Sequence, residues 1–230
     1  MFNPEEDENI VGNAGIFTQA EWESDSEFRK TGSVMKLVID GRAGAGTITM
    51  GGYDYHTGDR STGEIRDERA GRCMGACLEY AQKKKKPLMM YVFSDGSVAS
   101  NGTIDTSAAG RDKGVWTGDN SSTGAAFFLV YNPPEGGGKP TLKGNGEEDD
   151  KLARQQIGYM DSNGAVQTGS SPAANNPNLL AQTVVLNYMA LHGESEQSRF
   201  FDLFGTDLGS QDTQEGLVAF NGIVDVTIPT

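Results

Sequence analysis

Long polar stretches separate the apolar residues of this 230-residue chain into a few short runs. Residues 88–93 and 125–131 are apolar without alternation, which is typical of strands buried on both faces of a parallel sheet. A shorter β-type run, residues 47–50, predicts one further strand. Helical periodicity extends over residues 63–85 and 179–191. This order predicts an α/β fold in which helices flank a mostly parallel sheet.

Two segments leave more than one interpretation open. Residues Val34–Ile39 fit a helix or a strand, because so short a run does not distinguish the two periods. The lysines Lys83–Lys86 stand at the end of the predicted helix 63–85, just before Pro87. Cations there complement the helix dipole, and a basic patch for nucleic acid is the alternative. The acidity of the whole chain favours the helix-end interpretation.

Two further segments depart from the α/β pattern. Residues 1–30 are acidic and weakly patterned, and we expect an arm without a core of its own that docks through Phe17 and Trp22. Residues 132–178 are poor in apolar residues and rich in Gly, Pro, Asn and acidic residues. So long a loop is unusual inside a compact domain and suggests an excursion that contacts another molecule.

The last segment predicts a β-hairpin. Asn221-Gly222 lies between two runs rich in β-type residues, which is a strong signal for a type I′ turn. A short helical run, residues 198–204, precedes this extension. We therefore expect an acidic arm, an α/β domain that contains the long excursion, and a hairpin extension, over residues 1–30, 31–204 and 205–230 respectively.

Charge and composition argue against several classes of protein. A net charge of −13 argues against a nucleic-acid surface, which needs clustered Lys and Arg. No apolar run approaches the roughly 20 residues that span a bilayer. The acidic N-terminus lacks the basic start and apolar segment of a signal peptide. We expect a soluble protein without an export signal, located in the cytoplasm or in a particle, whose 31 glycines form many turns around a modest core.

The chain has two cysteines, Cys73 and Cys77. Their spacing places both on one face of the predicted helix, where their Cβ vectors run parallel and suit a disulfide poorly. A metal site built on them needs further ligands, and the chain has two histidines in all. We therefore expect two reduced cysteines that serve as small core residues in a reducing compartment.

Polar groups near the ends of the predicted strands are candidates for chemistry. Asp54 and His56 follow residues 47–50, Asp95 follows residues 88–93, and Asp112 lies in the next polar segment. Loops at the carboxyl ends of parallel strands meet at one edge of the sheet, so these side chains are expected to converge. Together they form a set that binds a divalent metal, which would polarise a phosphoryl or sulfuryl oxygen. The alternative is that each aspartate is an ordinary turn or cap residue.

The same residues carry a resemblance to a known family. Gly51-Gly52-Tyr53-Asp54-Tyr55-His56 precedes a predicted helix and strand, and these are followed by Ser94-Asp95-Gly96 and then by Gly110, Asp112, Gly114 and Trp116 at alternate positions. This order resembles the C-terminal half of a family of uncharacterised bacterial proteins in the alkaline phosphatase superfamily, alongside the sulfatases. The family's motifs are Gly-Gly-Phe-Asp-Thr-His, Ser-Asp/Glu-Phe-Gly-Arg and Thr-Asp-His-Gly-Trp-Gly. The resemblance covers residues 30–204 and implies a partial alkaline-phosphatase-like sheet with a metal held by Asp54, His56, Asp95 and Asp112.

The chain departs from that family at three points. Lys113 replaces the histidine of the third motif, and its ammonium would neutralise the carboxylates and leave the site without metal. The arginine of the second motif is absent, with Ser94–Val98 in its place. The family's N-terminal half, which bears the nucleophile, has no counterpart here, so that another chain supplies it or the domain is a scaffold.

These observations lead to two main functional hypotheses. The first is a non-catalytic structural or assembly protein on a degenerate alkaline-phosphatase-like domain, which needs no cofactor and forms a homo- or hetero-oligomer in a virion, a surface assembly or another particle. The second is a metal-dependent phosphoester or sulfoester hydrolase subunit whose nucleophile lies on another chain. A small-molecule binding module that uses the same loops is a third hypothesis. We favour the first, because it accounts for Lys113, the missing half and the excursion over residues 132–178.

Overall fold

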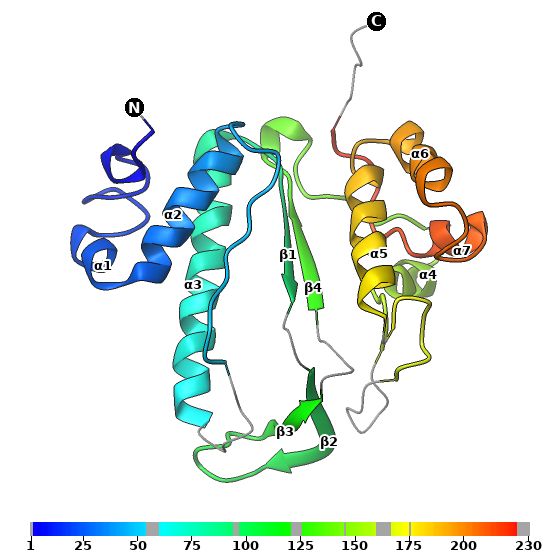
Figure 1. Cartoon of the computed structure of the whole chain (residues 1–230), viewed down its shortest axis with the longest axis horizontal. Helices are drawn as coiled ribbons and strands as arrows, with labels where there is room; N and C mark the ends of the chain where they lie inside the picture. Colours follow the sequence, from blue (N-terminus) through cyan, green and yellow to red (C-terminus); the bar gives the residue numbers. More distant parts are fainter. Residues whose placement is uncertain are drawn as a thin grey trace, which may run out of the picture. The chain divides into compact units, whose positions relative to one another are not determined.

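The computed structural model describes residues 2–53, 60–93, 97–120, 126–144, 146–159, 167–174 and 176–224 (Figure 1). Its helices and strands confirm a mixed α/β fold. The chain divides into two compact units. Unit 1 contains residues 1–88 and 131–139, and unit 2 contains residues 89–130 and 140–230.

Unit 1 is built from helices, whose ends are set by capping residues. The described helices are η1 (Pro4–Glu6), α1 (Gln19–Ser24), α2 (Ser26–Ile39), α3 (Arg60–Lys84) and η2 (Pro134–Gly136). Thr18 and Glu21 form a capping box at the start of α1, in which each side chain accepts a hydrogen bond from the other residue's backbone N–H. Asp25 ends α1, and its carboxylate accepts from the backbone N–H of Glu27 at the start of α2. These caps satisfy backbone donors that a helix leaves unpaired at its N-terminus.

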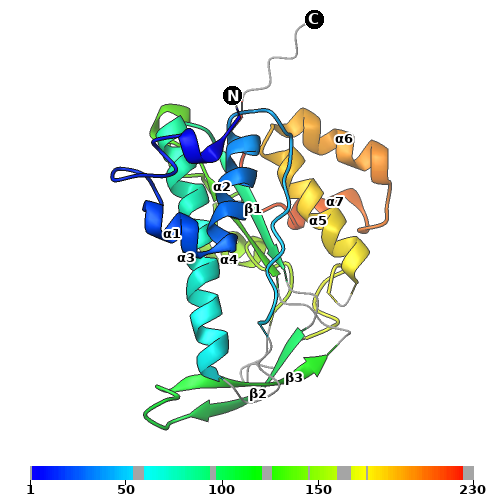
Figure 2. The same ribbon diagram turned by 60° about the vertical axis from the view of Figure 1, so that its left-hand side comes forward.

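Helices α2 and α3 pack side by side and form the core of unit 1 (Figures 1 and 2). The buried residues of α2 recur every three or four positions, and they are Phe28, Thr31, Gly32, Met35 and Ile39. Those of α3 are Cys73, Ala76, Cys77, Tyr80 and Ala81. Val34–Ile39 are therefore helical, and both cysteines are free and buried as predicted. Burial raises the pKa of the Cys77 thiol to about 12, which keeps it protonated at neutral pH.

Residues 1–30 belong to this core and do not form a separate arm. Ile10, Phe17 and Trp22 are buried, with exposed fractions of 0%, 1% and 4%. The ring of Phe17 stacks on that of Phe28 in α2, with 4.9 Å between the ring centroids. Phe17 and Trp22 are the contact residues that the sequence predicted. The acidic composition of residues 1–30 led to the wrong prediction that the segment has no core of its own.

A charged cluster fastens the N-terminal segment to both long helices. The Nζ atom of Lys36 lies 2.6 Å from a carboxylate oxygen of Asp7 and 2.8 Å from one of Asp40. The hydroxyl of Tyr80 donates to the same two carboxylates, at 2.9 and 3.1 Å. All four side chains are largely shielded from water, so the cluster joins η1, α2 and α3 through paired charges.

Residues 47–50 do not form the predicted strand. They belong to an extended segment without regular structure that runs along α2 and α3 in both views (Figures 1 and 2). The Lys30 ammonium donates to the backbone carbonyl of Thr49 at 2.7 Å. A strand needs a neighbour for its backbone hydrogen bonds, and this segment has no strand partner among the described residues.

The strands form two separate two-stranded sheets in the described part of the chain. β1 (Leu88–Phe93) pairs with β4 (Ala126–Tyr131), and β2 (Ser97–Asp105) pairs with β3 (Lys113–Asn120). The β2–β3 pair is antiparallel and has irregular register near Val98 and Ser100. The predicted strands at 88–93 and 125–131 are confirmed, whereas the mostly parallel sheet is not. The polar residues of β2 and β3 lack the apolar periodicity that would reveal an added hairpin.

The strands of the β1–β4 sheet are less buried than predicted. β1 is half-buried along its length and ends at the exposed Phe93. Burial alternates over the first four residues of β4, where Phe127 and Leu129 are exposed. A continuous apolar run predicts that a strand is buried on both faces. Whether it is buried depends on the segments that pack on those faces, and the run itself does not encode them.

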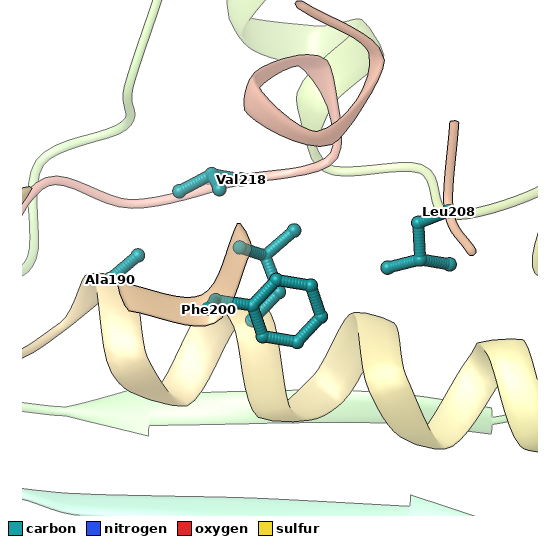
Figure 3. Packing of buried hydrophobic residues seen from close by; sticks show 5 residues of the cluster. Ala190, Phe200, Leu208 and Val218 are labelled. Carbon is teal, nitrogen blue, oxygen red and sulfur yellow. The ribbon is translucent and has the colours of Figure 1, made fainter. Parts of the chain in front are cut away.

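Helices supply the core of unit 2 around a central apolar cluster. They are α4 (Glu148–Arg154), α5 (Pro177–Ala190), α6 (Glu194–Phe204) and α7 (Gln211–Gly216). The helices predicted over 179–191 and 198–204 are thereby confirmed. The buried cluster brings together α5, α6 and the segments on either side of α7 (Figure 3), and it consists of Leu186, Ala190, Phe200, Leu208 and Val218. Among the described residues, no helix combines the length and apolarity needed to cross a bilayer.

The long excursion and the C-terminal extension contain more structure than the sequence indicates. Residues 132–178 include η2, α4 and the buried Asn132 and Ala173. The predicted extension 205–230 contains α7. The first strand of the predicted hairpin pairs elsewhere, because Phe220 forms an isolated antiparallel bridge with Leu142. Residues 225–230, which include most of the second strand, lie outside the described residues.

Candidate functional site

Of the four predicted metal ligands, the structure describes Asp112. Asp54, His56 and Asp95 lie outside the described residues, so their convergence stays a prediction. Asp112 is exposed in the turn between β2 and β3, and its backbone N–H donates to the carbonyl of Asp105 at 3.0 Å. Lys113, which replaces the family histidine, is exposed next to it. Within the described ranges, no group of three or more His, Cys, Asp or Glu side chains is arranged to hold a metal ion.

The turn itself explains part of the third motif. Arg111 and Asp112 both have positive φ angles, 52° and 56°, so the chain reverses sharply between β2 and β3. Gly110 lies against Asp105, and a Cβ atom on Gly110 would overlap that residue's side chain and carbonyl oxygen. Gly110 and Asp112 are thus both used by a hairpin turn, which is the alternative role that the sequence left open for the aspartate.

The start of the Gly51–Arg60 loop is docked on α3 by Arg66. The Arg66 guanidinium donates to the backbone carbonyl of Gly51 at 2.9 Å. Gly52 has a φ angle of +84°, and a Cβ atom there would overlap the Arg66 side chain. Tyr53 contributes to the raised pKa of the Arg69 guanidinium, on the next turn of the helix. The second glycine of the first motif therefore has a structural reason, because only glycine accepts both this backbone angle and this contact.

Substitution of Gly52 tests this docking. We expect Gly52→Ala to lower the free energy of unfolding by about 1–3 kcal/mol, since alanine at positive φ is strained and its methyl group displaces Arg66. Urea unfolding followed by circular dichroism measures the change. Gly51→Ala is the matched control, because nothing lies within 4 Å of a Cβ at that position. Equal losses in the two variants would show that the contact with Arg66 has no role.

Beside this docked segment, a groove separates the start of α2 from the N-terminal half of α3. It has a volume of about 350 Å³ and is lined by eight residues, namely Asp25, Phe28, Thr62, Ile65, Arg66, Glu68, Arg69 and Arg72. Three of these are arginines, spaced three residues apart, so they occupy one face of α3. Sequence analysis missed the groove, because the periodicity of residues 63–85 was used only to find the buried face.

The arginines differ in how completely they are paired. Arg72 lies 2.6 Å from a carboxylate oxygen of Glu21 and covers the ring of Phe28 at 5.0 Å. The backbone N–H of Thr18, together with Arg72, lowers the pKa of Glu21 to about 2. Arg69 lies 3.8 Å from Asp25, which is too long for a hydrogen bond, and its Nε atom is buried without an acceptor.

Arg69 nevertheless keeps its charge. Burial lowers the pKa of this guanidinium, but the hydrogen bond with Tyr53 and the charges of Asp25 and Glu27 raise it by more. Arg69 is therefore a permanently charged residue at the groove, while its Nε–H group is shielded from solvent. Asp25 and Glu68 line the groove with the three arginines, and Glu21 pairs with Arg72, so positive and negative side chains are balanced there.

Comparisons with known protein families, curated proteins and solved structures find no match to this chain.

Proposed function

We propose that this protein is a non-catalytic structural or assembly component that acts in a larger complex with other protein chains. In this proposal the α/β domain is a degenerate alkaline-phosphatase-like domain, and β1 and β4 belong to a mostly parallel sheet that a partner covers or extends. The complex is a virion, a surface assembly or a comparable particle.

The distribution of exposed apolar side chains carries the proposal. Eleven large apolar side chains are exposed among the described residues, and two of them, Leu37 and Ile65, belong to unit 1. The other nine belong to unit 2, and they are Phe93, Ile104, Phe127, Leu129, Leu152, Tyr159, Val185, Tyr188 and Leu203. These side chains supply apolar surface in unit 2 that a protein partner would bury.

The β1–β4 sheet supports the same conclusion. A two-stranded sheet is marginally stable by itself, and unpaired edges of apolar strands invite pairing with another chain. Both strands are uncharged along their whole length, so neither carries the charged residues that usually protect an edge. A partner that covers Phe127 and Leu129 would stabilise this sheet.

The mass of the protein in solution tests the proposal. We expect a mass well above the 24.5 kDa of one chain, or recovery of the chain in a larger native complex, by light scattering coupled to size-exclusion chromatography. Val185→Glu and Phe127→Glu, made together, should lower this mass, since each places a charge on the exposed apolar surface of unit 2.

Leu37→Glu is the control for the added charge. Leu37 and Val185 are both helical and similarly exposed, at 37% and 40%, but Leu37 belongs to unit 1. The control variant should keep the mass of the unmodified protein. A partner-free monomer under native conditions would overturn the proposal, and so would an equal loss of mass in the control.

A further inference from the structure

We propose that residues 46–50 bind the same residues of a second copy of this chain, so that the two segments pair as antiparallel β-strands. The partner is therefore an identical chain, and backbone hydrogen bonds join the two copies. This contact goes beyond the proposed function, because it lies in unit 1 and uses none of the exposed apolar side chains of unit 2.

The segment has the side-chain pattern of a strand without a partner. Exposure alternates over Thr47–Met50, where the threonines are exposed and Ile48 and Met50 are half-buried. A Cβ atom on Gly46 would overlap the Val34 side chain, so the face that contains positions 46, 48 and 50 is turned toward α2. Alternation with a period of two is typical of a strand that is buried on one face. Packing on α2 therefore holds the segment as a strand that awaits pairing.

Side chains from the two long helices already hold one edge of the segment. The Thr49 carbonyl accepts from the Lys30 ammonium at 2.7 Å, and the Gly51 carbonyl accepts from the Arg66 guanidinium at 2.9 Å. Every second carbonyl of an extended chain points to the same edge. The odd-numbered residues therefore face the edge that Lys30 and Arg66 occupy.

The opposite edge is available for another strand. Gly46, Ile48 and Met50 direct their N–H and C=O groups there, and within the described ranges none of these groups forms a backbone hydrogen bond. Unpaired groups along an extended segment are a template for strand addition. Charged residues and proline, which usually block such an edge, are absent from residues 43–53.

Charge favours a second copy as the occupant of this edge. The net charge of −13 makes two copies repel each other in general. Residues 41–53 contain no acidic side chain, so two copies that meet at this stretch avoid placing carboxylates against each other. The contact needs no charged partner, because the backbone supplies both the donors and the acceptors.

The segment is complementary to itself in one register. When the pairing is centred on Ile48, this residue exchanges both backbone hydrogen bonds with Ile48 of the second copy, and Gly46 lies opposite Met50. The same register places Thr47 opposite Thr49 on the exposed face, where cross-strand threonine pairs are favourable. The contact is two-fold symmetric, as contacts between identical subunits commonly are.

Cysteine cross-linking tests the contact and its register. Thr47→Cys and Thr49→Cys are made as separate full-length proteins with tags of different size, and the two are then mixed and oxidised. The predicted register places these positions in a closely spaced pair, with about 4.5 Å between Cα atoms, which suits a disulfide. In either variant alone the two cysteines lie diagonally, about 7–8 Å apart, which is too far. Both native cysteines are buried.

We expect the mixture to give at least tenfold more disulfide-linked dimer than either variant alone, as measured on non-reducing gels. A mixture of Ser24→Cys with Thr49→Cys measures the background, because Ser24 is exposed in α1 of the same unit. Ile48→Pro, added to both cysteine variants, should lower the yield about tenfold, since proline lacks the N–H at the centre of the pair. Ile48→Ala keeps this N–H and should retain the yield. Circular dichroism checks that each variant is folded.

Three results would overturn the proposal. They are a yield no higher than the Ser24→Cys background, equal yields from the mixture and from either variant alone, and equal losses in Ile48→Pro and Ile48→Ala. A background yield from a protein whose native mass exceeds that of one chain would overturn this contact and leave assembly through unit 2 standing. Cross-linking that persists in Val185→Glu with Phe127→Glu would support a contact independent of that surface.

Discussion

Asn187→Ala is expected to lower the free energy of unfolding by about 3–5 kcal/mol. Asn187 is 2% exposed, and its amide links α5 to the segment that follows α7. The Nδ2 group donates to the carbonyls of Thr183 and Leu217, each at 2.9 Å, and the Oδ1 atom accepts from the backbone N–H of Ala219 at 2.9 Å.

The substitution leaves one buried and one partly buried backbone group without partners. The Leu217 carbonyl and the Ala219 N–H lose the bonds that hold the C-terminal segment against α5. Each unpaired buried group costs roughly 1–3 kcal/mol. Alanine is the better helix former by about 0.5 kcal/mol, which is too little to offset this loss.

Urea unfolding monitored by circular dichroism measures the effect, and Asn221→Ala provides the control. Asn221 lies in the same segment and donates to Thr141 and Leu142, but it is exposed. Water replaces these bonds when the side chain is removed, so we expect the control to lose less than about 1 kcal/mol. A loss in Asn187→Ala no greater than in the control would show that the amide does not hold the segment.

Lys36→Met is expected to destabilise the protein by about 2–4 kcal/mol at pH 7, because it leaves two shielded carboxylates without their shared cation. Asp7 and Asp40 lie 2.6 and 2.8 Å from the Lys36 ammonium, and their side chains are 10% and 19% exposed. Lys84 lies farther from them, at 4.0 and 3.5 Å, and compensates only in part. Methionine keeps the length of the side chain, so the loss reports on charge more than on packing.

The pKa values of the two carboxylates set the pH dependence. Burial alone would raise both, but the hydrogen bonds from Lys36 and Tyr80 lower each pKa below the ordinary 3.8, and the charge of Lys36 adds to the lowering at Asp40. A lowered pKa contributes stability that is fully present above the unfolded value and is lost as the pH falls through the folded value. The difference between the unmodified protein and Lys36→Met should therefore be largest near pH 7 and shrink below about pH 4.

Unfolding curves at pH 7 and at pH 3.5–4 test the expected loss of stability at neutral pH and its decrease at low pH. Lys83→Met is the control, since Lys83 and Glu79 form a surface pair at 3.4 Å whose side chains are 30% and 50% exposed, and such a pair is worth less than about 1 kcal/mol. Two results would contradict the role of the cluster. One is a loss in Lys36→Met as small as in the control, and the other is a difference that grows as the pH falls.

The elements predicted correctly are those whose signal is local. Helices α3 and α5 and strands β1 and β4 follow from periodicity or from continuous apolar runs, and Pro87 marked the end of the first of these helices. The segment Val34–Ile39 stayed ambiguous because its helical character depends on the apolar contacts of α2 with α3. Residues 47–50 were predicted wrongly, since a short β-type run becomes a strand only when another strand pairs with it.

The candidate sites also differ in whether a local signal in the sequence reveals them. The sequence selected Asp54, His56, Asp95 and Asp112 by residue type and by position after a strand, and the structure describes Asp112 as an exposed turn residue. The groove on α3 left no comparable signal, because Arg66, Arg69 and Arg72 read as ordinary solvated charges of a helix. What makes them line a groove is the approach of Asp25 and Phe28 from α2, which the spacing within α3 does not encode.

Local pattern was enough to predict the mixed α/β class, the long helices, the two apolar strands and the burial of both cysteines, because each depends on neighbours within a few residues. Three other features became visible in the three-dimensional structure: residues 1–30 belong to the core, Lys36 joins Asp7 to Asp40, and Asn187 binds the C-terminal segment. The contacts of Lys36 with Asp7 and of Asn187 with Leu217 join residues about 30 positions apart. Burial and charge pairing over such separations depend on the path of the whole chain. Gly52 shows both kinds of information, since its motif was visible in the sequence and the reason for a glycine there, the Arg66 side chain, was visible only in the fold.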